Sequence, residues 1–430
     1  MNITDALVAF STIDADPEAR DMMRLSLFDW AACGMAGAAE TDFAGFSRLV
    51  LQQGGTAEAM TLLGSTIPAA AAALVNGTLS HALDFDDTHF AHIGHPSVVV
   101  VPAALAVAQK EGLGFEAMLD AALIGVEASI HVGLWLGRDH YQIGFHQTAT
   151  AGAFGATLAT ARLLGLTNCE TRHALGLCAS MASGVKAQFG TAGKPLNAGL
   201  AARNGVEAAL WAHQGMTAAW DGLDGPSGFG DTHHGSAQTE HLATLGNAPW
   251  HILSISHKFH ACCHGLHAML EAIAGTAISR DDVKAVAITT HPRWMSVCNK
   301  ADPTTGLEAK FSYRHTAAMA LSGISTSRRE MFSDAMANDP ALGALRQKIL
   351  VHEDAGLSEM QAKVQITRQN GEVAEFSHDL AAPMRLATRR EKLQIKARDL
   401  VGAEMADQIW AAIASDDFAG LCLILGGSKR

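Results

Sequence analysis

The segment His81–Ser97 reads HALDFDDTHFAHIGHPS and contains seven ionisable side chains in seventeen positions. Imidazoles titrate near neutral pH, and a neighbouring carboxylate raises their basicity, so such a segment suits proton transfer. The same residue types could also bind a metal ion or cap helices. The candidates are three carboxylates and four imidazoles: Asp84, Asp86, Asp87, His81, His89, His92 and His95.

The metal interpretation has weak support from spacing. His89 and His92, or the run CCHGLH from Cys262 to His267, could supply zinc ligands, but the chain contains no HExxH and no paired CxxC. Capping could account for Asp84, Asp87 and Thr88, with Pro96 near the first turn of a following helix. Capping does not explain four imidazoles in one connection, so we expect proton transfer without a metal ion.

Four further polar segments interrupt the apolar background, and each lies near the start of a predicted helix. Free amides and the helix dipole favour anions at such positions. The chain as a whole is acidic, with a formal charge of −12, which argues against broad binding of nucleic acid or of an anionic membrane. The sequence therefore predicts a site for a small anion, built from GFHQT (144–148), GTAGKPLN (190–197), HKFHACCH (257–264) and KFSYRH (310–315).

Length and composition indicate a folded protein of two domains, because 430 residues exceed the size of one growing core and 48% are hydrophobic. The first residues lack the pattern of a signal peptide, and no segment offers about 18 consecutive apolar residues. Seven cysteines, two of them adjacent, do not suggest a disulfide framework. We expect a cytoplasmic protein.

Apolar residues recur at helical spacing up to about residue 240, in 18–36, 67–83, 102–110, 115–134, 148–164 and 195–213. Dense Ala and Gly in these segments predict close helix packing. After the Gly-rich stretch 221–236, β-branched runs appear, and Asn370-Gly371 is typical of a hairpin. The tail from about 393 is helical again. The pattern predicts an all-helical domain over 1–245 with 393–430, and a smaller α+β domain over 246–392.

Four segments together carry a resemblance that extends over nearly the whole chain. HALDFDDTHFAHIGHPS, GFHQTATAGAFGA, GTAGKPLNAGLAARNGVEAA and KFHACCHGLHA, in this order and spacing, resemble the MmgE/PrpD family, whose members include 2-methylcitrate dehydratase, cis-aconitate decarboxylase and iminodisuccinate epimerase. The resemblance implies a mainly α fold, with a large all-helical domain and a smaller α+β lid. It also implies a homodimer, with an active site between the domains.

The resemblance assigns roles by position. The DxDDT motif falls on Asp84 to Thr88, the HP that follows on His95-Pro96, the GxHxT histidine on His146 and the TKP lysine on Lys194. His95 would act as acid or base, Asp84 would orient an imidazole or the lysine, and Lys194 and His146 would hold and neutralise carboxylates. The expected catalytic residues are thus His95, Asp84, Thr88, His146 and Lys194.

The expected substrate-binding residues include three departures from the family pattern. Asn197, His257 and His315 stand where many members carry a histidine, a lysine and a tyrosine, and Lys258 and Arg314 are neighbours that could compensate. The full set is Asp87, Asn197, His257, Lys258, Cys262, Arg314 and His315.

These residues imply a lyase that needs no cofactor and abstracts a proton next to a carboxylate of a small di- or tricarboxylate. A dehydratase is the first expectation, an epimerase of an iminodicarboxylate the second and a cis-aconitate-type decarboxylase the third. A metal hydrolase and a non-catalytic helical interaction protein remain as other classes. Metal analysis of the purified protein distinguishes a metal hydrolase from the lyase. The basic clusters argue against a non-catalytic interaction protein.

Overall fold

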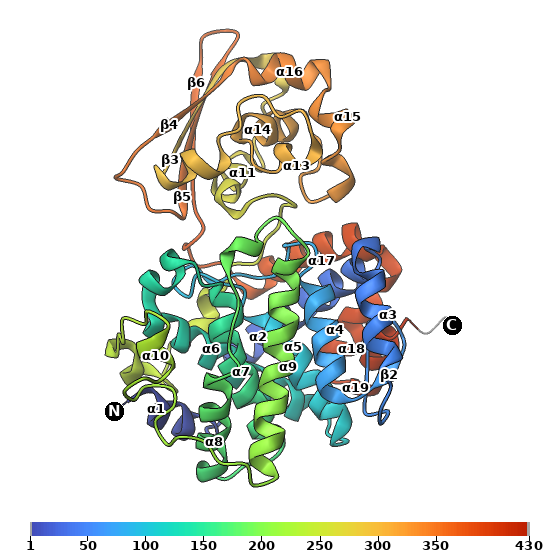
Figure 1. Ribbon diagram of the computed structural model, residues 1–430. Coiled ribbons are helices and arrows are strands. Elements are labelled where there is room, and N and C mark those ends of the chain that lie inside the picture. The colour runs from blue at the N-terminus through green and yellow to red at the C-terminus, as the bar shows by residue number, and fades with distance from the viewer. Residues whose placement is uncertain (1, 428–430) are drawn as a thin grey trace. The chain divides into compact units, whose positions relative to one another are not determined.

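The computed structural model describes residues 2–427 and divides the chain into two compact units, which are drawn in Figure 1. The larger unit contains the chain up to His257 and again from Arg389, and the smaller unit contains Lys258–Thr388. The larger unit is almost entirely helical, whereas the smaller one combines a sheet with short helices. The predicted mainly α fold is therefore confirmed.

The larger unit is built around α5 (Ser97–Lys110) and α7 (Gln147–Leu163), whose side chains are nearly all buried. Around them pack α4 (Ala69–Ser80), α6 (Phe115–Ile143) and α9 (Gly193–His213). The remaining elements of this unit are α1 (Ile3–Phe10), α2 (Pro17–Ala38), α3 (Ala44–Gln52), β1 (Ala59–Met60), β2 (Thr66–Ile67), α8 (Asn168–Ala179), α10 (Phe229–Thr232), α17 (Leu386–Val401, from Arg389 onward), α18 (Ala403–Ala414) and α19 (Phe418–Leu425).

Several of the polar segments singled out in the sequence lie at the ends of these packed helices. His81 follows the last residue of α4, Pro96 precedes α5, His146 precedes α7, and Lys194 lies in the first turn of α9. Pro102, expected at the start of a helix, instead lies inside α5. A proline removes one backbone hydrogen bond there, and burial of the whole helix outweighs that loss.

Glycines set the close approach of two helix pairs. A Cβ atom added to Gly125 of α6 would lie 2.6 Å from the carbonyl oxygen of Gly155 in α7. A Cβ atom added to Gly77 of α4 would lie 2.9 Å from the Cα atom of Gly199 in α9. The predicted close packing of Gly-rich helices is thereby confirmed, because larger side chains would push these backbones apart.

Residues 246–257 belong to the larger unit, whereas the sequence pattern predicted that they would belong to the smaller one. The ring of Trp250 lies 5.5 Å from that of Phe10, and the N–H groups of His251 and Ile252 donate to Glu127 of α6. Arg389 donates to the carbonyl oxygen of Ile255 and so joins the same unit. These contacts are distant in sequence, so the local pattern does not report them.

The smaller unit contains a four-stranded sheet in the order β4-β3-β5-β6, with β3 (Val283–Thr290), β4 (Ile349–Glu353), β5 (Gln361–Arg368) and β6 (Val373–Asp379). β3 pairs with β4 in parallel and with β5 antiparallel. β5 and β6 form the predicted hairpin, and Gly371 has the positive φ of 88° that its turn requires. The helices are α11 (His267–Ile273), α12 (Arg293–Cys298), α13 (Gly306–Ala309), α14 (Tyr313–Leu321), α15 (Asp334–Ala337) and α16 (Pro340–Arg346).

Helix α6 is long and apolar enough to cross a membrane, by length and composition alone. Its apolar window is 83% buried inside the unit, where α7 covers much of it. Core packing therefore explains its apolar character.

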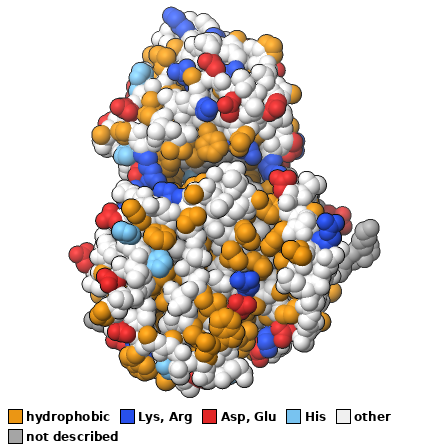
Figure 2. Space-filling model, viewed as in Figure 1, with side chains coloured by type: hydrophobic (Ala, Val, Ile, Leu, Met, Phe, Trp, Pro, Cys, Tyr) orange, Lys and Arg blue, Asp and Glu red, His pale blue; other side chains and the backbone are white. Residues whose placement is uncertain are grey.

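The outer surface of the larger unit carries apolar as well as charged side chains. Figure 2 shows hydrophobic side chains in extended patches among scattered acidic and basic ones. Trp211, Met216 and Trp220 are among the exposed large apolar residues of the described chain.

Candidate active site

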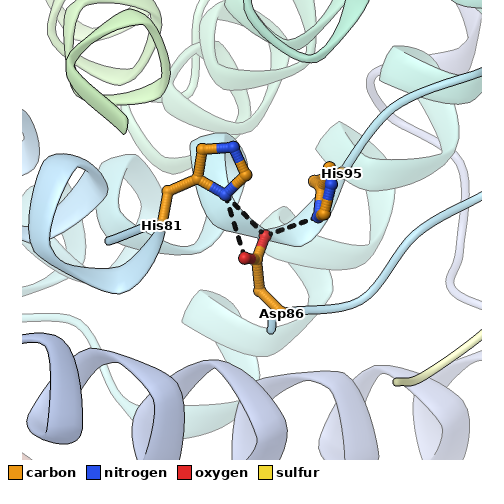
Figure 3. Close-up of side chains that lie close together, drawn as sticks. All are labelled: His81, Asp86 and His95. Atoms are coloured by element: carbon orange, nitrogen blue, oxygen red, sulfur yellow. Dashed lines mark hydrogen bonds and ion pairs between the residues drawn. The ribbon is translucent and has the colours of Figure 1, made fainter. Parts of the chain in front are cut away.

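Asp86 lies between two histidines at the centre of the candidate site (Figure 3). Its carboxylate oxygens lie 2.9 and 3.1 Å from Nδ1 of His81, and Oδ2 lies 2.9 Å from Nδ1 of His95. The three side chains come from the end of α4, the connection that follows it and the residue before Pro96. All three are buried. His81 and Asp86 were not among the predicted site residues, although both lie in the segment that drew attention.

The connection between α4 and α5 folds back on itself to bring these residues together. Asp84 and Ile93 adopt positive φ values of 49° and 56°, and the N–H of His89 donates to the carbonyl oxygen of Gly94. Lys396 of α17 donates to the carbonyl oxygen of Phe85 over 2.5 Å. The site is therefore held by a helix more than 300 residues away in sequence.

The pKa values of His81, Asp86 and His95 are shifted in different directions. Burial lowers the pKa of His81 to about 4, although Asp86 opposes the shift, so this ring is neutral. Burial alone would raise the pKa of Asp86, but His81 and His95 hold it well below its usual value. Burial alone would lower the pKa of His95, but the charges and hydrogen bonds of Asp86 and Asp84 outweigh it, so this pKa is raised.

Both ring nitrogens of His95 face carboxylates. Nδ1 lies 2.9 Å from Asp86, and Nε2 lies 3.3 Å from Oδ1 of Asp84. A neutral imidazole would direct a lone pair at one of these oxygens, whereas the imidazolium offers a proton to each. The geometry thus favours a protonated His95, which can act as a general acid.

Lys194 extends this group toward solvent. Its Nζ atom lies 2.6 Å from Oδ1 of Asp84, and the ammonium group lies 5.3 Å from the centre of the Phe189 ring. Asp84 is half exposed at its side chain, whereas Asp86 is buried. Asp84 therefore contacts both a lysine and an imidazole, the two alternative partners that the family resemblance implied for it.

His146 lies beside the same group with a defined tautomer. Its ring stacks on that of His81, with the ring centroids 6.0 Å apart. Its Nδ1 accepts a hydrogen bond from the amide nitrogen of Asn197 over 3.3 Å, so in the neutral ring the proton is on Nε2. Burial holds the pKa of His146 well below its usual value, so it offers a hydrogen bond and not the charge that was expected.

Three predicted residues of the larger unit serve its interior. Asp87 accepts from the hydroxyl of Ser97 over 2.5 Å at the start of α5. The hydroxyl of Thr88 donates to the carbonyl oxygen of Ser256 over 3.1 Å. His257 is buried, with Nε2 3.1 Å from Ser26 Oγ and Nδ1 3.1 Å from Arg389. As placed, both ring nitrogens of His257 are used in the core.

The other four predicted residues lie in the smaller unit. Lys258 and Cys262 are buried near its first residues, and burial raises the pKa of the Cys262 thiol well above its usual value. His315 is fully buried in α14, where its Nδ1 lies 2.9 Å from Arg346. Burial lowers the pKa of His315 to about 4. Arg314 precedes it and is partly buried.

The group around Asp86 also has the ligand types of a zinc site. His81, Asp86 and His95 each offer a nitrogen or oxygen atom, all within 4.8 Å of one another. However, the Asp86 carboxylate already lies against the Nδ1 atoms of both histidines. Hydrogen bonds and ion pairs thus engage Asp86 and both Nδ1 atoms, whereas Nε2 of His81 has no hydrogen-bond partner among residues 2–427.

Comparison with known proteins extends the sequence argument. Residues 2–242 match the model of the MmgE/PrpD N-terminal domain, and residues 260–416 match that of the C-terminal domain. A cis-aconitate decarboxylase of Aspergillus terreus is 32% identical over 225 residues, covering 49% of this chain and 46% of that protein. Human cis-aconitate decarboxylase is 28% identical over 302 residues, covering 66% and 61%. The matched part thus spans about half the length of the first of these relatives. Because the two family models together cover most of the sequence, this chain belongs to the MmgE/PrpD family.

Proposed function

We propose that this protein is a lyase that needs no cofactor and acts on a small di- or tricarboxylate, with His95 as the proton donor. The observation that carries the proposal is the position of His95 between two carboxylates, which favours its protonated form. A buried general acid beside a partly exposed lysine suits an anionic substrate whose reaction leaves negative charge next to a carboxylate.

Decarboxylation is the reaction we place first, in contrast to the order expected from sequence. The relatives named above are called cis-aconitate decarboxylases. In such a reaction a C–C bond breaks, CO2 leaves, and the electron pair remains on a carbon conjugated with a second carboxylate. A proton from the His95 imidazolium then completes the product.

Dehydration is the second candidate, because the same imidazolium could protonate a departing hydroxyl group. A separate base would have to remove the proton from the neighbouring carbon, so dehydration needs one group more than decarboxylation does. Epimerisation has less support, because it begins with abstraction of a proton, and a histidine that already holds both protons cannot accept one.

Substrate carboxylates would contact Lys194 and the Nε2–H of His146. At present Lys194 bonds to Asp84, so a bound carboxylate would compete with Asp84 for the ammonium group. Displacement of Asp84 would also weaken its hold on Nε2 of His95 and release that proton toward the substrate. Binding and proton delivery are coupled in this way.

The proposal is tested by incubating the protein in deuterated water with cis-aconitate, with hydroxylated tricarboxylates and with an amino-dicarboxylate, followed by NMR. Decarboxylation gives CO2 and a C5 dicarboxylate that carries one deuterium. Dehydration gives loss of a hydroxylated substrate, and epimerisation gives exchange without net loss. No turnover of any of these acids would contradict the proposal.

Replacement of Lys194 by methionine should lower kcat/KM by roughly 10²–10³-fold, as for loss of one preorganised charge contact. Methionine keeps much of the length of the side chain over Phe189 and removes only the cation. Steady-state kinetics with the accepted substrate measure the effect. Lys186→Met is the matched control, because Lys186 donates to the carbonyl oxygen of Tyr141. Equal rates in the two variants would place the anion elsewhere.

Replacement of Asp86 by asparagine should move the alkaline limb of the pH profile to lower pH. The raised pKa of His95 means that its acid form is lost as pH rises through that value. Without the Asp86 charge the pKa falls, so the loss begins at lower pH. At neutral pH, kcat/KM should fall by less than the about 10²–10⁴-fold expected for loss of the acid itself. An unchanged limb of kcat/KM would show that Asp86 has only a structural role.

Treatment with a chelator should leave the activity intact. The Asp86 carboxylate is already engaged with the Nδ1 atoms of His81 and His95, and none of the proposed steps uses a metal ion. The assay is run below the unfolding temperature, with metal content measured before and after. Activity that disappears and returns with added zinc or iron would contradict this expectation.

The homodimer that the family resemblance implies is also a proposal here. The exposed apolar side chains of Trp211, Met216 and Trp220 are consistent with it. Sedimentation of the purified protein measures the assembly.

A further inference from the structure

A second group of imidazoles surrounds Glu127, within the larger unit. Glu127 and His131 lie one turn apart on α6, and His251 begins the short 3-10 helix η4 (His251–Ser254). Nε2 of His131 lies 3.4 Å from Oε1 of Glu127, and the rings of His131 and His251 are 4.7 Å apart. One ligand atom from each of the three lies within 4.8 Å of the others.

The hydrogen bonds present do not use all the capacity of this group. Glu127 accepts from the N–H of His251 over 2.7 Å and from that of Ile252 over 2.9 Å, one on each oxygen. An ionised carboxylate has about four acceptor positions, so about two remain, and Nε2 of His131 faces one of the oxygens at 3.4 Å. His131 is fully buried, and neither of its ring nitrogens has a hydrogen-bond partner among residues 2–427. Such an unsatisfied buried ring calls for a ligand or another explanation.

We propose that Glu127, His131 and His251 bind one divalent transition-metal ion, with Zn²⁺ as the best fit. Two imidazoles and one carboxylate are a ligand set that zinc uses, with bonds of about 2.0–2.2 Å. In a tetrahedron with such bonds, ligand atoms lie about 3.3 Å apart. The His131–Glu127 pair already has this spacing, at 3.4 Å.

His251 closes the site. Its side chain is partly exposed, unlike that of His131, so the ring can turn toward the other two ligands and the ion can enter from its side. Water would complete the coordination. The ring of His241 lies 5.3 Å from that of His131, and its Nε2 donates to the carbonyl oxygen of His131 over 3.0 Å.

The ion would link Glu127 of α6 to His251, which lies 124 positions later in the sequence. Its effect would be on stability, because none of the three ligands belongs to the Asp86 group. The inference therefore does not depend on the proposed function.

The test uses untagged, metal-free protein titrated with Zn²⁺ by calorimetry and with Co²⁺ by visible absorption, which reports tetrahedral coordination. We expect one equivalent of each ion to bind. Zn²⁺ at about 100 times Kd should raise Tm by roughly 3–4 °C. His251→Ala should lose most of the affinity with little effect on the fold, because its side chain is partly exposed. Glu127→Gln keeps an oxygen for the N–H groups but removes the charge, and should also weaken binding. His213→Ala, an exposed site on α9, is the control and should bind as the parent does.

Two outcomes would overturn the inference. One is the absence of a stoichiometric site in the parent protein at micromolar metal. The other is binding that His251→Ala and Glu127→Gln leave unchanged. If such binding were abolished by a change at His81, the ion would lie at Asp86.

Discussion

Replacement of His95 by glutamine is expected to lower turnover by about 10²–10⁴-fold, the usual contribution of one positioned general acid. Glutamine can still reach Asp86 or Asp84 with an amide but cannot deliver a proton. The incorporation of solvent deuterium into product should fall in parallel. Substrate affinity should change little, because Lys194 and His146 remain. Kinetics and NMR in deuterated water, on the substrate found in the screen, measure these effects.

The matched control for this variant is His213→Gln, because His213 is an exposed histidine of α9. A circular dichroism spectrum equal to that of the parent would show that the buried pair with Asp86 is not needed for folding. If His95→Gln incorporated deuterium at the parent rate, the proton would have to come from another group. His146 would be the next candidate, because its Nε2 carries a proton in the same group.

Replacement of Lys396 by methionine should lower the free energy of unfolding by about 3–5 kcal/mol, as when one partner of a buried ion pair is removed. Nζ of Lys396 lies 2.5 Å from Oδ1 of Asp29, and both side chains are about 1% exposed. The change leaves Asp29 buried without its cation. It also removes the donor to the carbonyl oxygen of Phe85, so activity should fall with stability. Denaturant unfolding gives the free energy.

Arg398→Met is the control on the same helix, because the Arg398–Asp407 pair is about half exposed. Exposed pairs of this kind contribute about 0–1 kcal/mol. The double variant with Asp29→Asn should recover part of the loss, because it removes the uncompensated charge. Similar stability in Lys396→Met and Arg398→Met would mean that the Lys396–Asp29 pair is not a net stabilising contact.

Much of the fold could be predicted from the sequence, because helices and hairpins depend on neighbours a few positions apart. Apolar spacing located α2, α4, α6, α7 and α9 to within a few residues at most of their ends, and Asn370-Gly371 located the hairpin between β5 and β6. Motif spacing identified the family and brought out His95, Asp84, Lys194 and His146, which the structure places in one group. Each of these features depends on a short stretch of sequence, either a local pattern or a family motif.

Only the tertiary structure decided how the ionisable groups share their charges. The pairing of Asp86 with His81 and His95 requires the connection after α4 to reverse at the positive φ of Asp84, which no local pattern specifies. The contacts of Lys396 with Asp29 and Phe85, and of His257 with Ser26 and Arg389, join residues more than 100 positions apart. A side chain's pKa depends on its burial and on every charge nearby, whichever part of the chain supplies it. For that reason the sequence left His95 open as an acid or a base, whereas its two carboxylate neighbours in the packed structure favour the acid.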